Sequence, residues 1–470
     1  MPLRFEEQRE TASEIDREGA LPLDLVFASF GPLYRDAHVL AQSDPTAVAR
    51  HDRVVPPGRI RAESHTLGSP LQGVLSAARN VLDQWTSEGV RGWLAEWSGG
   101  RSDWMGLMKK RIREPLARVL GADPLNVVIR SVLTENLATA LRVLNQPQSD
   151  REQRRKILTQ EFLFPGDADV IASELEYQRQ DPKSDIIQVR PSLGRGLFRT
   201  TDFIDALELH KDEAGVCVFE HQPYLTGQVL DMHEIVSCAK ELGYYTIVDF
   251  AHSGGVYPLR LADMRPHFGI GPGYKEFLAG PGTSAWMYAD MELLTEGGFW
   301  LPKGWIGRSD ATRFKFGGDY EADQGALRFL RSTPSPILLA MWAAILQYYT
   351  DVGGIETVYQ QALQRGSLFI EALKAHPDYG RRLAVLTPSD PLERSAEISV
   401  MFASAEESAN LFQRLADATD SELAIDADTR IAFFDPNKGI MRFGWHPFST
   451  THNEVVQAAE SIWNGLQRLS

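Results

Sequence analysis

The sequence predicts an α/β protein with a large, mostly parallel sheet domain and a smaller α+β domain at its C-terminal end. From about residue 70 onward, short apolar runs alternate with segments of helical spacing, which favours a parallel sheet covered on both faces. A proline-rich break at residues 332–336 precedes a long apolar helix and indicates a hinge. A chain of 470 residues is also too long for one simple core.

The elements of the large domain follow from the spacing of apolar residues. Apolar, β-rich runs that are typical of buried strands occur at 126–132, 156–164, 215–219 and 244–250. Helical spacing occurs at 71–85, 135–144 and 231–242. We therefore expect strands and helices to alternate throughout this domain.

The expected domain boundaries divide the chain into three parts. Residues 1–70 are a mixed polar segment that completes the small domain, residues 71–335 form the large domain, and residues 336–470 form the small C-terminal domain. The C-terminal part is expected to contain a helix at 334–349, strands at 397–402 and 439–444, and a final helix at 453–469.

The net charge, apolar runs and cysteine count indicate which kinds of binding partner and which compartment to expect. A net charge of -15 argues against nucleic acid, which needs a basic footprint, and against docking on an anionic membrane. The N-terminus has no apolar signal region, and no run of about 18 apolar residues occurs, so no membrane span is expected. Only Cys217 and Cys238 are present, which fits a reducing compartment. We expect a cytoplasmic protein whose partners are neither nucleic acid nor membrane.

The most informative pair of residues is Asp249 and Lys275. Asp249 ends an apolar run, so a buried strand would deliver it to the ligand-binding edge of the sheet, and Lys275 follows 26 residues later on a glycine-rich loop. Pyridoxal phosphate (PLP) needs an acid that keeps its ring nitrogen protonated and a lysine that holds its aldehyde as a Schiff base. By spacing alone, the commoner interpretation is that the acid is a helix cap and the lysine a solvated charge. Asp249 and His252 lack the further ligands of a metal site.

Other segments carry residue types that suit the same ligand. Thr134 stands where a strand passes into a helix, a position that suits a phosphate, although threonine caps are common. Phe164 and Asp167 follow another strand, where the ring is either a cofactor contact or a core residue. Trp305 stands in a polar loop, and Arg442 lies in a strand-like run where a partly buried guanidinium requires a carboxylate.

In this order, the segments resemble those of the kynureninase family, in the aminotransferase class V branch of the fold-type I PLP enzymes. The match extends from about His65 to Phe448. Residues 164–167 resemble the family's Phe-Pro-Ser-Asp, residues 249–255 its Asp-Leu-Ala-His-Ser-Ala-Gly, and residues 274–282 its Tyr-Lys-Tyr-Leu-Asn-Gly-Gly-Pro-Gly. No single motif is specific, but several in the same order are.

The resemblance implies a fold-type I PLP-dependent transferase fold and a homodimer with shared active sites. It implies that Lys275 is the Schiff-base lysine and that Asp249 is the partner of the pyridine nitrogen. The other cofactor contacts that it implies are Leu133, Thr134, Phe164, Asp167, His252, Tyr274, Trp305 and Thr333. Arg442 falls where the family binds the substrate carboxylate, and Thr333 where one subunit contributes to the site of the other.

The departures from the family pattern lie mainly around the substrate. His65 and Thr66 replace the middle of the family's Gly-Asn-Ser-Leu-Gly, Gly166 replaces a serine, and Arg308 replaces a histidine. Because the cofactor residues are retained, the sequence predicts PLP chemistry on an altered substrate, with His65, Thr66 and Arg308 among its contacts.

The reaction expected from the resemblance is cleavage at the Cβ side of an α-amino acid. The substrate would be a modified or biosynthetic amino acid of secondary metabolism rather than kynurenine. The alternatives are β-elimination or decarboxylation–deamination of a cysteine S-conjugate, transamination or racemisation on the same scaffold, and a catalytically inactive PLP-binding homologue.

Overall fold

The computed structural model describes residues 23–146, 154–417 and 423–469. The described residues fall into two compact units, which we treat separately. Unit 1 lies within Met1–Ser69, Leu225–Gln228 and Glu356–Ser470, and unit 2 lies within Pro70–Tyr224 and Val229–Ile355. An α/β unit and a smaller α+β unit agree with the predicted fold class.

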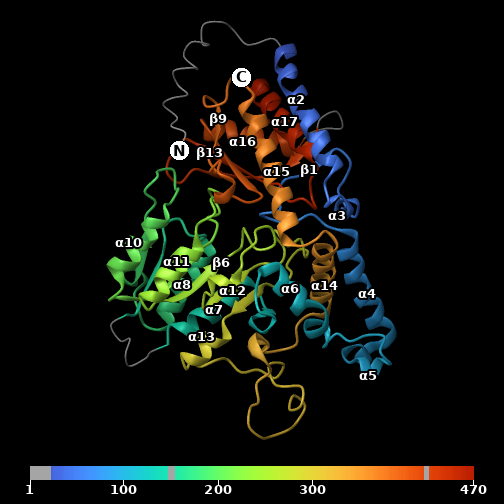
Figure 1. The fold of residues 1–470 in the computed structure, drawn as a ribbon, viewed down its shortest axis with the longest axis vertical. Coiled ribbons are helices and arrows are strands. Elements are labelled where there is room, and N and C mark those ends of the chain that lie inside the picture. Colours follow the sequence, from blue (N-terminus) through green and yellow to red (C-terminus); the bar gives the residue numbers. More distant parts are fainter. Residues whose placement is uncertain (1–22, 147–153, 418–422, 470) are drawn as a thin grey trace. The chain divides into compact units, whose positions relative to one another are not determined.

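Unit 2 is built on a seven-stranded sheet with the order β2-β8-β7-β6-β5-β3-β4 (Figure 1). β7, β6, β5, β3 and β4 are parallel, and β8 is antiparallel to both of its neighbours. The strands are β2 (Val127–Ile129), β3 (Lys156–Gln160), β4 (Ile186–Val189), β5 (Ala214–Glu220), β6 (Tyr245–Asp249), β7 (Phe268–Gly271) and β8 (Trp286–Ala289). All residues of β5 are buried, as expected for a parallel strand covered on both faces.

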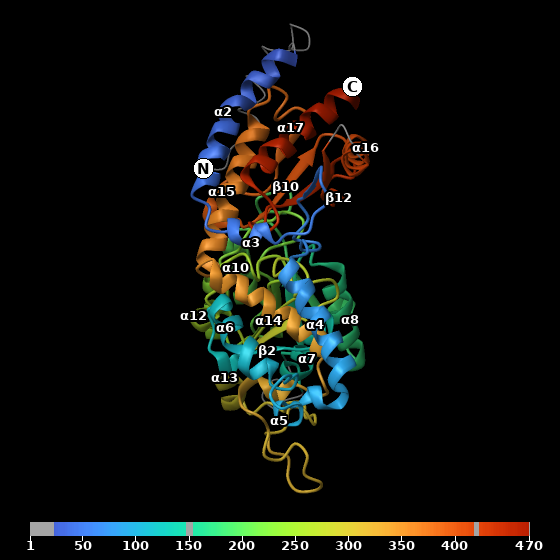
Figure 2. The same cartoon turned by 90° about the vertical axis from the view of Figure 1, so that its right-hand side faces the viewer.

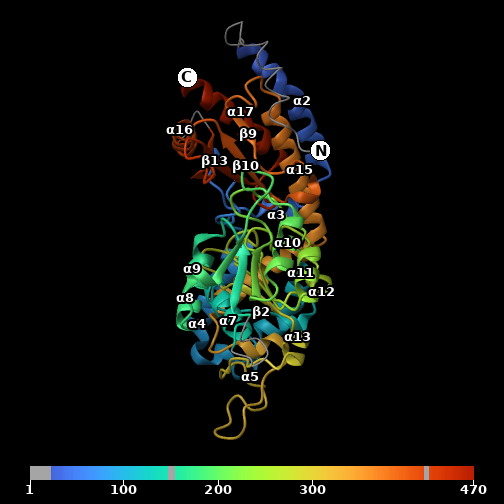
Figure 3. The ribbon, with the colours of Figure 1, turned by 90° about the vertical axis from the view of Figure 1, so that its left-hand side faces the viewer.

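Helices cover both faces of this sheet. α7 (Leu133–Leu144) and α8 (Pro165–Tyr177) lie on one face, and α10 (Thr200–His210) and α11 (Met232–Glu241) lie on the other (Figure 3). The predicted alternation of strands and helices is therefore confirmed. The smaller elements of unit 2 are α5 (Ala95–Ser98), α6 (Arg113–Leu120), α9 (Pro182–Asp185), α12 (Leu261–Met264), α13 (Met291–Glu296) and the short turns η1 (Gly89–Trp93), η2 (Met108–Ile112), η3 (Pro124–Asn126) and η4 (Gly325–Phe329).

Two long helices of unit 2, α4 (Gln72–Glu88) and α14 (Pro336–Asp351), lie side by side (Figure 2). The backbone N–H of Gly73 donates to the Tyr348 hydroxyl over 3.1 Å, and Trp342 Nε1 donates to the Ser284 carbonyl over 2.9 Å. The expected boundary at residue 335 assigned α14 to the small domain, whereas the structure groups it with unit 2. The reason is that the apolar face of α14 is buried on the large sheet domain rather than on the C-terminal strands.

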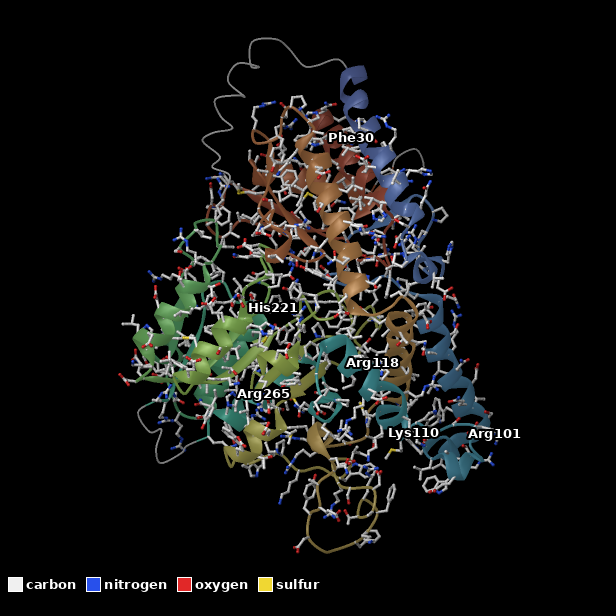
Figure 4. All side chains as sticks on the ribbon, in the orientation of Figure 1. Phe30, Arg101, Lys110, Arg118, His221 and Arg265 are labelled. Carbon is white, nitrogen blue, oxygen red and sulfur yellow. The ribbon has the colours of Figure 1, made fainter. Side chains whose placement is uncertain are left out.

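Unit 1 contains an antiparallel sheet with the order β12-β13-β10-β9 and a parallel pair of β1 and β11. Its strands are β1 (Arg59–Arg61), β9 (Leu383–Val385), β10 (Glu397–Phe402), β11 (Ala424–Asp426), β12 (Asp428–Ile431) and β13 (Gly439–Gly444). Its helices are α2 (Leu23–Gln42), α3 (Ala47–His51), α15 (Ile355–Lys374), η5 (Pro391–Glu393), α16 (Ala405–Ala416) and α17 (His452–Leu469). The core includes the packed rings of Phe369, Phe443 and Trp445, together with Phe30 (Figure 4). The strands predicted at 397–402 and 439–444 are confirmed as β10 and β13.

The two cysteines are free thiols in unit 2. Cys217 is buried in β5 and Cys238 is half-buried on α11, and burial raises the pKa of both thiols. Among the residues that the structure describes, no helix is both long and apolar enough to cross a membrane.

Candidate cofactor site

Asp249 ends β6 and lies at the carboxyl edge of the parallel sheet. It pairs in register with Glu220 at the end of β5, and the backbone N–H of His221 donates to the Asp249 carbonyl over 2.8 Å. The Asp249 carboxylate accepts the backbone N–H of Ala251 over 2.7 Å. The strand thus carries a buried acid to the edge at which open α/β folds bind ligands.

Lys275 reaches the same edge from the loop that follows β7, the neighbour of β6. Its Nζ lies 3.0 Å from Nε2 of His252 and 5.6 Å from the centre of the Phe164 ring. His252 belongs to the turn after Asp249. The structure therefore brings together the acid, the histidine and the lysine of two adjacent loops, as the sequence predicted.

A second acid, Asp167 at the start of α8, pairs with Asp249. The two carboxyl groups are hydrogen-bonded to each other. Burial, followed by the charge of Asp249 and the hydrogen bond to it, holds the pKa of Asp167 well above its usual range, with a smaller contribution from Glu220. Burial also raises the pKa of Asp249, and the hydrogen bond to Asp167 and then the charge of Lys275 partly offset that rise. Of the two carboxyl groups, Asp167 is therefore the one that its surroundings more strongly favour in the protonated form.

Phe164 precedes α8 and forms an aromatic wall near Lys275. Its ring is 43% exposed and stands edge-on to Tyr224, with ring centres 5.4 Å apart. Gly166 lies against this ring, since a Cβ added there would be 3.0 Å from Cε1 of Phe164. A side chain at position 166 would press on the ring, which gives a physical reason for a glycine where the family pattern has a serine.

The candidate phosphate side is formed by the beginning of α7. Leu133 and Thr134 occupy the first turn of this helix, and the Thr134 side chain is exposed. The residue before the helix, Val132, provides no side-chain cap, so the start of the helix has the features of an anion-binding site. Tyr274 is half-buried, and burial followed by the charges of Asp249 and Asp167 raises the pKa of its hydroxyl, so it stays a neutral donor.

Two neighbouring residues were missed in the sequence. Glu220 ends β5 one residue beyond the apolar run at 215–219, and the backbone N–H of Phe164 donates to it over 3.0 Å. His221 follows, with Nδ1 2.8 Å from the hydroxyl of Ser253 (Figure 4). Burial lowers the pKa of His221 to about 3, so its ring is neutral at physiological pH. The only signal for either residue was its position at the carboxyl end of a buried strand.

Trp305, Arg308 and Thr333 belong to a different part of unit 2. They lie in or just after a long connection between α13 and α14, part of which extends away from the sheet (Figure 1). The Trp305 ring contacts that of Phe314, with ring centres 6.1 Å apart, and the Arg308 guanidinium lies 5.2 Å from the centre of the Tyr320 ring. Trp305 and Thr333 are both exposed. These ring contacts of Trp305 and Arg308 are thus with residues of the same connection.

Arg442, His65 and Thr66 lie in unit 1. Arg442 is buried on β13, where its guanidinium pairs with Glu397 over 3.4 Å and contacts Asp428 of β12. The expectation of a buried guanidinium with a carboxylate partner is confirmed, but protein side chains provide the carboxylates. His65 packs near the end of the same strand, because a Cβ added at Gly444 would lie 2.8 Å from its Nδ1. Thr66 is exposed in the adjacent turn.

The donor set of the cluster in unit 2 fits PLP. Lys275 supplies an amine, Asp249 a carboxyl group, Phe164 a flat apolar surface, and the start of α7 the features of an anion site. Within the described residues, no group of three or more His, Cys, Asp or Glu side chains has a metal-holding arrangement.

Comparison with known proteins extends these observations. The chain is 30% identical to a kynureninase from Eremothecium gossypii over 348 residues, which is 72% of this chain and 76% of that protein. It is 28% identical to a kynureninase from Myxococcus xanthus over 422 residues, or 89% of this chain and 90% of that protein. No protein-family model matched the chain.

Solved structures share the fold. A C-DES variant with glycine covalently linked to its PLP cofactor has a TM-score of 0.70 and 20% identity, covering 89% of this chain and 98% of that chain. The cysteine desulfurase CsdA from Escherichia coli has a TM-score of 0.69 and 16% identity, covering 90% of this chain and 98% of that chain. These similarities show that the chain has the fold of the fold-type I PLP enzymes.

Proposed function

Because the chain belongs to the kynureninase family of PLP-dependent enzymes, we propose that it cleaves a bond at the Cβ side of an α-amino acid other than ordinary kynurenine. The observation that carries this proposal is the arrangement of Lys275, His252, Asp249 and Asp167 at one edge of the sheet. The proposed substrate is a modified or biosynthetic amino acid of secondary metabolism, because the departures from the family are concentrated among the residues assigned to its side chain.

The proposed roles follow from the geometry of unit 2. When bound, PLP supplies an electron sink for the α-carbon of an amino acid joined to it. Lys275 removes the α-proton as general base, and His252, 3.0 Å from its Nζ, orients the amine. Asp249 would hold the ring nitrogen protonated, and Asp167 would support the charge of Asp249 through the hydrogen bond between the two carboxyls. Phe164 would cover one face of the cofactor ring.

We assign the α-carboxylate of the substrate to Arg442. Guanidinium groups bind carboxylates through paired hydrogen bonds, and Arg442 already binds the carboxylates of Glu397 and Asp428. Binding the substrate requires an exchange of partners, in which the substrate carboxylate takes the place of Asp428. Glu397 is fully buried and stays in place.

We further propose a homodimer in which each active site uses residues of both copies. Trp305 and Thr333 support this assignment, because both are exposed and Trp305 contacts Phe314 of its own segment rather than the Lys275 cluster. In such a dimer, these side chains would contact the cofactor or substrate bound in the active site of the second copy. The proposed location of the dimer is the cytoplasm.

Mass spectrometry of the products from a panel of kynurenines and S-substituted cysteines tests the reaction, with Lys275→Ala as the inactive control. We expect a product that has lost the part of the side chain beyond Cβ, and slow turnover of kynurenine and 3-hydroxykynurenine. Rapid hydrolysis of kynurenine to anthranilate would contradict the substrate assignment. A product that keeps its whole side chain and loses only its amino group would instead show transamination.

A further inference from the structure

Glu220 is a buried carboxylate that the cofactor chemistry does not use. It is 3% exposed and ends β5. Its Oε1 accepts the backbone N–H of Phe164 over 3.0 Å, and its Oε2 accepts Nε2 of Gln160 over 2.9 Å. The side chain of Gln160 also accepts the backbone N–H of Glu220 over 2.9 Å, so the two residues are clamped to each other. The carboxylate is thus fixed in position and directed at one backbone group.

Glu220 binds the backbone of Phe164, the residue that provides the aromatic wall, and Phe164 in turn bonds to the backbone of Asp167, the second acid. The N–H of Phe164 donates to Glu220, and the carbonyl of Phe164 accepts the N–H of Asp167 over 2.9 Å. Earlier in the same connection, Phe162 has a φ of 62°, a left-handed conformation that residues with side chains adopt at an energetic cost. Such a conformation persists only where surrounding contacts hold it, and the bond to Glu220 is such a contact.

We propose that Glu220 is a positioning residue, which fixes the connection between β3 and α8 so that Phe164 and Asp167 meet the bound cofactor. The inference rests on the proposed assignment of the site around Lys275 and Asp249. It adds a residue that acts through Phe164 and Asp167 and has no contact with the reacting atoms.

The carboxylate suits this task better than a neutral acceptor for two reasons. A hydrogen bond from a backbone N–H to an ionised oxygen is shorter and stronger than one to a neutral oxygen. In addition, the charge of Glu220 contributes to raising the pKa of Asp167, which helps Asp167 keep the proton that it donates to Asp249. The reach of the side chain is nevertheless the essential property, because only a side chain of this length spans the distance to Phe164.

Two variants separate reach from charge. Glu220→Asp keeps the charge but shortens the side chain by one methylene, so the oxygen no longer meets the N–H of Phe164. Glu220→Gln loses the charge but keeps an oxygen at the same distance. The cofactor-free protein of each variant is titrated with PLP, and the dissociation constant is measured by quenching of tryptophan fluorescence. The induced visible circular dichroism of the bound cofactor reports how the ring is seated.

We expect Glu220→Asp to raise the dissociation constant about tenfold, as for the loss of one charge-assisted hydrogen bond, and to reduce the induced circular dichroism. Glu220→Gln should stay within about threefold of the unmodified protein in affinity and keep the circular dichroism band. The inference is overturned if Glu220→Asp also stays within threefold, or if Glu220→Gln loses as much as Glu220→Asp.

Glu174→Gln is the matched control. Glu174 lies on α8, the helix that also carries Asp167. It is 4% exposed, and its carboxylate pairs with Arg142 over 2.7 Å and not with the backbone of Phe164. Its substitution should lower the melting temperature without changing the PLP affinity. Borohydride reduction and peptide mapping of each variant locate the cofactor independently. A label away from Lys275 would refute the site itself, whereas a label on Lys275 with unchanged affinity in Glu220→Asp would refute only the role of Glu220.

Discussion

Two regions of unit 2 carry predicted site residues but are built in opposite ways. In the cofactor cluster, Asp249, Asp167 and His252 are each no more than 5% exposed, and their side chains bond to one another or to Lys275. In the exposed segment, residues 300–323, the rings of Trp305, Phe314 and Phe316 are 42%, 61% and 105% exposed. The side chains of the first region are bonded to one another, and the second region presents large apolar side chains to its surroundings.

The difference shows what a single chain can specify. Buried charged groups must be satisfied locally, so the acids and the amine of the cluster define one another's positions. The rings of the exposed segment bury little apolar area within their own chain, and apolar surface of this kind marks a site of association. In the proposed homodimer, the cluster is the catalytic half of the site and the exposed segment is the half that each copy contributes to its partner.

The largest expected effect is in the cluster, on substitution of Lys275. Lys275→Ala removes both the anchoring amine and the base, so kcat should fall by roughly 10³-fold or more, although PLP can still bind through its phosphate. Borohydride reduction of the unmodified protein, followed by peptide mapping, should place the label on Lys275. Lys211→Ala, at the exposed end of α10, is the control and should keep full activity. A label on another lysine would sink the assignment.

Asp249→Asn tests the charged partner of the ring nitrogen. A neutral amide cannot hold that nitrogen protonated, so kcat should fall roughly 10²-fold to 10³-fold while the fold and part of the cofactor affinity are retained. Steady-state kinetics together with the visible spectrum measure this split. The control is Asp290→Asn, which removes a buried carboxylate that follows β8 and pairs with Arg265. It should lower stability but not the activity per folded molecule. Full activity in Asp249→Asn would exclude Asp249 as the ring partner.

The exposed segment is tested by mixing the inactive Lys275→Ala variant with the less active Trp305→Ala variant. Trp305→Ala alone should lower kcat/KM about tenfold, as expected for loss of an aromatic contact. If sites are shared, each dimer formed from one Lys275→Ala chain and one Trp305→Ala chain contains one site without either substitution. Because random exchange of equal amounts makes half of the dimers mixed, about a quarter of all sites should then be unmodified. Subunit exchange followed by activity assays measures this recovery.

Failure to recover activity in the mixture would place Trp305 and Lys275 in the same chain's site. Sedimentation of each variant provides the control, because both must form dimers for the mixture to be informative. An active monomer would remove the reason for treating the exposed segment as a contribution to a partner.

Arg308→Ala should affect binding more than turnover. If its guanidinium contacts the substrate side chain, KM should rise about fivefold to tenfold with a smaller fall in kcat, as for loss of an interaction made equally in the ground and transition states. Lys315→Ala removes an exposed cation of the same segment and should leave KM unchanged. A fall in kcat with constant KM would assign Arg308 to the reaction itself.

The smallest expected effect is on the pH dependence of stability of the cofactor-free protein. The pKa of Asp167 is raised on folding, so the stability that it contributes is fully present below the ordinary carboxyl pKa of about 3.9 and is lost as the pH rises through the raised value. Asp167→Asn keeps a donor to Asp249 without this titration. Its melting temperature at pH 8 should be about 2 °C higher than that of the unmodified protein, and the difference should shrink toward pH 4. The exposed Asp212→Asn should show no such trend.

Local patterns predicted much of the cluster. The apolar run before Asp249 indicated a buried parallel strand, and resemblance supplied Lys275, His252 and Phe164 in the correct order. The bond between Glu220 and Phe164 joins residues 56 positions apart and leaves no mark on either local pattern. The partners of Arg442 were hidden for the same reason, since Asp428 reaches it only when β12 pairs with β13. The grouping of α14 with unit 2 depends on which surface its apolar face meets, and helical periodicity does not specify that surface.

One hydroxyl group of α14 gives the cofactor edge an unexpected dependence on a distant part of the chain. Tyr349 donates over 2.5 Å to the carbonyl of Gly255, in the turn after Asp249, and lies 3.2 Å from the carbonyl of Glu276, the residue after Lys275. A single buried phenol therefore links the loop of the acid to the loop of the amine. If α14 opens as one cooperative unit, both loops lose their common attachment in the same event. Release of the cofactor and hydrogen exchange of the α14 amides would then share one rate, so the lifetime of the holoenzyme would be set by a helix that contributes no side chain to the chemistry.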